Sequence, residues 1–116
     1  MPIWSPASLE AEPKISLLSW HIIETELDEC HFIGVRPDTK AARISSPIYQ
    51  FDSLSKLGVT STGRRYQLIG DPGWSYDTVY LLVNWARQYG VISCDDVTDS
   101  FLGSSPQRVF GGTLLQ

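Results

Sequence analysis

Two histidines and two cysteines are the residues of this sequence whose side chains are best suited to chemistry. Cys30 and His31 are adjacent, as a thiol nucleophile and its general base would be. Neighbouring residues on a strand point to opposite faces, so the imidazole of His31 would point away from the thiol. The pair therefore predicts a buried structural cysteine beside a surface or turn histidine.

His21 and His31 offer a second arrangement. A hairpin that turns at Asp28-Glu29 would place the two imidazoles on facing strands, where Cys30 or Glu24 could join them. Histidine, cysteine and carboxylate groups are the usual ligands of zinc, although two histidines without close spacing are a weak signal. A small enzyme or a metal-binding domain that uses His21 and His31 is therefore kept as an alternative.

The acidic residues give no stronger signal of catalysis. Cys94 precedes Asp95 and Asp96, and two adjacent carboxylates raise the pKa of a thiol rather than activate it. Glu24 and Glu26 share a strand face, as the carboxyl pair of a glycosidase would, but no aromatic sugar platform accompanies them. We interpret them as a charged rim, and we expect no catalytic residue and no cofactor.

The stretch GVTSTGRRYQLIGDPG (58–73) has two glycines that bracket four residues, as in a phosphate-binding loop. Such a loop needs a lysine and then a hydroxyl residue at the start of a helix. Arg64 and Arg65 occupy those positions and the continuation resembles a strand, so the parts of the phosphate site are missing. The stretch instead predicts a tight hairpin with Thr62-Gly63 as a two-residue connection.

The aromatic residues carry the strongest functional signal. Trp74 and Tyr76 stand at a turn and at the first helical position, where side chains are often exposed, and Arg64 and Arg65 lie upstream. Trp, Tyr and Arg dominate the energetics of protein interfaces. Trp85 widens the apolar arc of the following helix beyond one packing face, so the tail or a partner must cover it. These five residues are the predicted partner-binding set.

The elements that must position these residues follow from the hydrophobic pattern. Prolines make residues 1–14 an irregular arm. Runs rich in β-formers predict strands, with an edge segment or loop after Pro47. The predicted strands span residues 15–27, 31–35, 41–48, 57–61 and 64–69. In the first, Leu18, Trp20 and Ile22 should share one face.

One helix is predicted clearly, from Tyr76 to Tyr89. Ser75 can cap its first amides, Asp77 suits the positive end of the helix dipole, and Gly90 supplies a left-handed stop. Four apolar residues follow the i, i+3, i+4, i+7 rule and should face a sheet. They are Val79, Leu82, Val83 and Ala86.

The order of strands followed by a helix predicts an α+β fold. We expect an antiparallel sheet of four to five strands over residues 15–70, with one long helix, 75–90, packed on one face. Residues 91–116 form an extended C-terminal tail, which we expect to be docked on its own domain. A chain of 116 residues fits a single domain, 1–116.

The charge distribution limits the classes of partner. The net charge is −4, and the cations gather in the central strands. They include Arg36, Arg43, Lys56, Arg64 and Arg65. Dispersed cations in an acidic protein disfavour nucleic-acid binding, and weak binding through the basic central strands stays an alternative. No apolar run is long enough to span a bilayer and two cysteines imply no disulfide framework, so we expect a cytoplasmic protein.

The sequence also resembles small uncharacterised bacterial and prophage-associated domains that share a GR-x-Y-x-L-x-G-x-PG signature. The matching residues here are Gly63, Arg64, Tyr66, Leu68, Gly70, Pro72 and Gly73. The resemblance covers about half of the chain and implies no catalytic residues. By type, it favours a stoichiometric inhibitor from a mobile element, such as an anti-CRISPR protein.

Together these observations predict a non-enzymatic protein-binding module, an inhibitor or regulator that acts by occluding the surface of a partner protein. A nuclease or effector complex of a host is one such partner. Homodimerisation through Trp85 and the tail is compatible with every one of these hypotheses.

Overall fold

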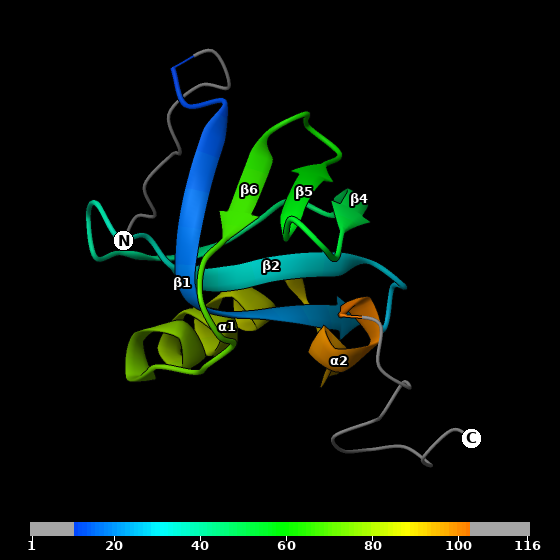
Figure 1. Cartoon of the computed structure of the whole chain (residues 1–116). Coiled ribbons are helices and arrows are strands. Elements are labelled where there is room, and N and C mark those ends of the chain that lie inside the picture. Colours follow the sequence, from blue (N-terminus) through cyan, green and yellow to red (C-terminus); the bar gives the residue numbers. More distant parts are fainter. Residues whose placement is uncertain (1–10, 103–116) are drawn as a thin grey trace.

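The computed structural model describes residues 11–102, which form one bent β-structure with two helices (Figure 1). The order along the chain is six strands, a helix, a seventh strand and a second helix. The elements are β1 (Lys14–Thr25), β2 (Cys30–Val35), β3 (Ala42–Ile44), β4 (Ile48–Asp52), β5 (Leu57–Thr60), β6 (Arg65–Leu68), α1 (Tyr76–Tyr89), β7 (Cys94–Asp96) and α2 (Thr98–Phe101).

The expected fold class is therefore wrong. Seven strands and two helices replace a four- to five-stranded sheet with one long helix, and β1 runs parallel to β6 in an otherwise antiparallel arrangement. The sequence pattern missed this because pairing of Ile15 with Tyr66 joins segments far apart in the chain, and no local signal specifies such a pairing.

Strand β1 is long and belongs to both halves of the structure. Its first part pairs with β6, and β5 and β4 follow outward; its second part lies between β2 and β7, with β3 beyond β2. The change occurs at an irregularity between Leu18 and His21, where Ser19 has a φ of 45°. In Figure 1 the strand changes direction midway.

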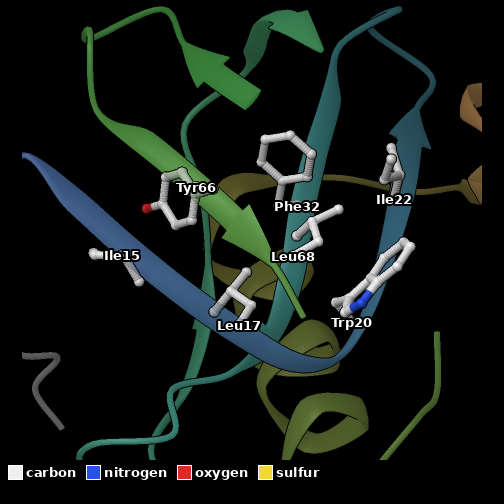
Figure 2. Close-up of a cluster of buried hydrophobic side chains, with 7 residues drawn as sticks. All are labelled: Ile15, Leu17, Trp20, Ile22, Phe32, Tyr66 and Leu68. Carbon is white, nitrogen blue, oxygen red and sulfur yellow. The ribbon is translucent and has the colours of Figure 1, made fainter. Parts of the chain in front are cut away.

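The irregularity also corrects the predicted faces of β1. Leu17, rather than Leu18, shares the buried face with Trp20 and Ile22, because the extra residue shifts the alternation by one position. The core lies inside the bend, where side chains of β1, β2 and β6 meet (Figure 2). Its members are Ile15, Leu17, Trp20, Ile22, Phe32, Tyr66 and Leu68.

Gly58 has a packing role rather than a phosphate-binding one. A Cβ added there would collide with the ring of Phe32, so only glycine lets this ring fill the core over β5. The predicted hairpin between β5 and β6 is present, but its loop has three residues instead of two. The backbone N–H of Thr60 donates to Arg64 O, and Gly63 takes the left-handed position with a φ of 94°.

Helix α1 lies against β2 and β3, on the face of the sheet opposite the core (Figure 1). His31 and Ile33 alternate with the core residue Phe32 along β2, so they point toward this helix. The segment after α1 is not the expected loop-like tail. It forms β7, paired with β1, and α2, whose Phe101 ring lies 5.8 Å from that of Phe51. Residues 1–10, with Trp4, and 103–116 lie outside the described range.

Candidate functional site

The start of α1 is fixed to the bend of β1 by the segment GDPGWS. The indole N–H of Trp20 donates to the carbonyl oxygens of Ile69 and Gly70, at 3.2 Å each, and the N–H of Gly73 donates back to Trp20 O at 3.1 Å. Because Trp20 is fully buried, these bonds hold the entry to the helix in one position.

The predicted bounds of α1 are confirmed. Ser75 is the N-cap: its hydroxyl accepts from the N–H of Thr78, and the Thr78 hydroxyl accepts from the N–H of Ser75, which completes a capping box. Gly90 ends the helix with a φ of 71°. These local signals determine where the helix starts and stops.

The predicted packing face of α1 is half correct. Leu82 and Ala86 are half-buried, as expected, but Val79 and Val83, which were also expected to face the sheet, are 46% and 49% exposed. Thr78 is fully buried instead, and Trp85 is half-buried, with its ring centroid 5.0 Å from that of His31 in an edge-to-face contact. The capping box holds Thr78 inward and Trp85 fills the space over β2, so the helix is rotated from the expected orientation.

This rotation leaves an apolar strip on the side of α1 that faces away from the sheet. We call it the outer face of α1, and it consists of Tyr76, Val79, Tyr80 and Val83. The spacing i, i+3, i+4, i+7 places the four side chains on one side of the helix. Tyr76 and Tyr80 are the most exposed, at 83% and 66%. The aqueous side of a helix is normally polar, so this strip needs an explanation.

Two predicted anchors lie beside or beneath this face. Trp74 is 41% exposed and stacks on His21 at a centroid separation of 4.3 Å, so one side of its ring is already covered. Trp85 is half-buried and its ring meets that of His31 on β2, so part of the ring is covered by the sheet rather than by the tail or a partner. Of the five predicted residues, Tyr76 is the one that lies on the outer face.

Arg64 and Arg65 are not brought together with Trp74 and Tyr76. They lie at the start of β6, and the chain reaches α1 from the other end of that strand (Figure 1). Arg64 is buried, and its Nε donates to Glu12 O at 2.8 Å, whereas Arg65 is exposed. Because Arg64 is buried, its side chain is not on the surface where it could serve as an anchor for a partner.

The sequence pattern placed Val79 and Val83 against the sheet and did not identify Tyr80. The signal that could have found these three residues is the width of the apolar arc of the helix, which is too large for one packing face. The exposed part of that arc is formed by Val79, Tyr80 and Val83, and not by Trp85, which lies on the opposite side of the helix.

His21 takes part in a cluster with Asp96 and Thr98, two residues that the sequence did not connect with it. Its Nδ1 lies 2.7 Å from Asp96 Oδ2 and 3.1 Å from Thr98 Oγ1. The Thr98 hydroxyl also accepts from the N–H of Ile22 at 3.0 Å and donates to Asp96 Oδ1. Burial opposes ionisation of Asp96, but the hydrogen bonds from His21 and Thr98 outweigh it and lower its pKa to about 2.

A carboxylate on Nδ1 is the arrangement that orients an imidazole as a general base for proton transfer. Yet Thr98 Oγ1 is committed to Asp96 and to the backbone, and Trp74 covers a face of the ring. A groove of about 480 Å³ lies elsewhere, along β4 and β5. The cluster joins β1 to β7 and α2, and we interpret it as a structural connection.

His31 is separate from this cluster. Its Nδ1 lies 2.8 Å from Ser45 O and its side chain is buried, and burial lowers its pKa although the bond to Ser45 opposes the change. Within residues 11–102 no three His, Cys, Asp or Glu side chains are grouped so that they could hold a metal ion. Burial raises the pKa of the Cys30 thiol to about 11, with Glu24 and Asp28 adding to the effect.

Several cations of the central strands are engaged within the protein. Arg36 forms ion pairs of 2.8 Å with both Glu12 and Asp38. Arg43 donates to the hydroxyl of Tyr66 at 3.0 Å, and the Lys56 ammonium lies 5.9 Å from the centre of the Trp20 ring. These contacts hold the cations against their own chain, which disfavours a continuous phosphate-binding surface.

No known family, no curated protein and no solved structure matches this chain at a significant level. The resemblance to prophage-associated domains therefore stays an expectation. Neither helix among residues 11–102 is long and apolar enough to cross a bilayer.

Proposed function

We propose that this chain is a non-enzymatic protein-binding module, a stoichiometric inhibitor or regulator that occludes a partner's surface with the outer face of α1. The observation that carries the proposal is the exposure of Tyr76, Val79, Tyr80 and Val83 on one side of a capped helix. Contiguous exposed apolar side chains on a soluble domain are typical of interaction sites.

The composition and the support of this face both favour binding. Tyrosine gives a large contact area for few rotatable bonds and is enriched among the residues that dominate interface energies. The helix is held at its start by the Ser75–Thr78 capping box and on its inner side by Trp85 against His31. A surface that is ordered before binding loses less conformational entropy when it meets a partner.

The test is affinity capture from host lysate with quantitative mass spectrometry. The Tyr76→Ala, Tyr80→Ala double variant removes the two most exposed rings of the face. We expect its recovery of the partner to fall about tenfold or more, because anchor residues of this type each contribute about 1–2 kcal/mol or more. Circular dichroism must show that the variant retains the helical signal of the wild type.

The matched control removes exposed apolar groups from another region. Tyr49 and Leu54 are 76% and 92% exposed and lie on β4 and in the turn after it, away from α1. The Tyr49→Ala, Leu54→Ala variant should capture the same partner as the wild type. Equal losses in both double variants, or no partner enriched by the wild type, would contradict the proposal.

A further inference from the structure

The outer face of α1 is bounded by opposite charges at its two ends. Asp77 lies in the first turn and Arg87 in the last, and both are exposed. The intervening strip is apolar except for Asn84 at its margin, whose side-chain N–H donates to Tyr80 O at 2.8 Å. A helix with this pattern is complementary to itself when the second helix runs in the opposite direction.

The geometry of such a pair can be worked out from the positions. In an antiparallel pair with its two-fold axis midway between Tyr80 and Val83, Tyr80 of each copy lies opposite Val83 of the other. Arg87 then lies opposite Tyr76 and beside Asp77 of the other copy. A guanidinium over a tyrosine ring and near a carboxylate is favourable on both counts. A parallel pair would instead place Arg87 against Arg87.

We propose that the outer face of α1 also pairs with the same face of a second copy of this chain, as an antiparallel helix pair. The inference rests on the proposed function, because it uses the same surface. A second copy would therefore compete with the partner, and the chain would bind its target as a monomer released from the pair. The symmetry is that of a closed two-fold dimer, in which each contact occurs twice.

The size of the surface sets the strength of the pair. A helix of 14 residues is about 21 Å long, and one side of it buries far less than the roughly 800 Å² per partner of a stable interface. We therefore expect a weak, reversible dimer with a Kd between about 1 µM and 1 mM. Weak pairing suits a surface that must become free when the target is present.

The experiment is sedimentation velocity on the full chain from about 1 µM to 1 mM, the range of the expected Kd. The wild type should change from monomer to dimer across this range. Asp77→Lys and Arg87→Glu should each weaken the dimer about tenfold, because each places like charges together at both ends of the pair. The Tyr49→Ala variant should dimerise as the wild type does.

Mixing the two charge variants gives the decisive result. In a mixed dimer Lys at position 77 of one chain meets Glu at position 87 of the other, and the remaining two positions keep their original Arg87–Asp77 contact. The mixture should recover a dimer that neither variant forms alone at the same concentration. Circular dichroism of each variant controls for the altered charge near a helix end.

Two outcomes overturn the inference. One is a monomer at every concentration, whether the face is open or covered by residues 1–10 or 103–116 of the same chain. The other is a dimer that is insensitive to both charge variants. Neither outcome affects the capture experiment, whereas capture that survives Tyr76→Ala, Tyr80→Ala would remove the proposed function and leave the dimer in place.

Discussion

The contact between His21 and Asp96 makes a measurable part of the folding stability depend on the charge of one carboxylate. We consider the substitution Asp96→Asn. It keeps the shape of the side chain and an oxygen that can accept from the N–H of Thr98, which now donates to Asp96 Oδ1 at 3.0 Å. It removes the negative charge that lies 2.7 Å from His21 Nδ1.

The magnitude follows from the pKa of this group. Burial raises it, but the bonds from His21 and Thr98 lower it more, from 3.8 to about 2. A difference of this size between unfolded and folded chains corresponds to about 2 kcal/mol of stability, which we treat as an upper figure because the side chain keeps 18% of its exposure. We therefore expect Asp96→Asn to lower the free energy of unfolding by about 1–2 kcal/mol near pH 6.

The direction of the pH dependence is also fixed. The folded chain holds the carboxylate with a lower pKa, so its contribution is complete above the unfolded value of 3.8 and is lost as the pH falls through about 2. The difference in the free energy of unfolding between wild type and Asp96→Asn should thus fall to about half of its pH 6 value at pH 3, and to a small fraction of it at pH 2. Other carboxyls titrate in both proteins and cancel in the difference.

The measurement is urea unfolding followed by tryptophan fluorescence at pH 6, 4, 3 and 2. Asp71→Asn removes an exposed carboxylate as a control, and it should change the free energy of unfolding by no more than about 0.5 kcal/mol. The reasoning is refuted if the difference between wild type and Asp96→Asn stays constant from pH 6 to pH 2, because the destabilisation would then be independent of the charge.

Three further predictions concern packing and thiol chemistry. Gly58→Ala should destabilise the protein by about 1–3 kcal/mol in thermal unfolding, and Phe32→Leu in the same chain should recover part of that loss, since the added methyl collides with the Phe32 ring. A double variant that is simply additive would argue against this contact. Trp85→Ala should lower the free energy of unfolding by about 2–3 kcal/mol, because the ring fills the space between α1 and β2. Val83→Ser, at an exposed position, should change the free energy of unfolding by no more than about 0.5 kcal/mol. A larger loss for Val83→Ser than for Trp85→Ala would support the orientation of α1 that was expected from the sequence. Finally, the pKa of Cys30, about 11 against an ordinary 9.0, implies about 100-fold less thiolate than in the unfolded chain near pH 8. Alkylation by iodoacetamide, resolved by peptide mass spectrometry, should be slower in the folded protein by a similar factor, and equal rates in guanidinium and in buffer would contradict the burial of this thiol.

The sequence predicted best what local chemistry decides. The bounds of α1 follow from Ser75 and Gly90, whose effects operate within one turn of the helix. The two arms of the β5–β6 hairpin follow in the same way, and Gly63 marks the loop between them. These elements need no information from distant parts of the chain.

What the sequence did not predict depends on contacts between distant segments. The rotation of α1 is set by Trp85 against His31, and the parallel pairing of Ile15 with Tyr66 depends on the position of the whole strand β6. Ser19 has a positive φ that its residue type does not signal, so the bend of β1 was not foreseen. The candidate surface was predicted by residue type at Tyr76 and missed at Val79 and Val83 for the same reason.

The shared strand β1 has a consequence for how this chain acquires its structure. Because its first part pairs with β6 and its second part with β2 and β7, the early segment of the chain cannot complete its ladder until much later residues have been synthesised. Distant pairings of this kind slow folding, since a long loop must close before they form. A nascent chain can therefore form only pairings between neighbouring strands, such as β1 with β2 and β2 with β3, until the residues of β6 and β7 have been synthesised.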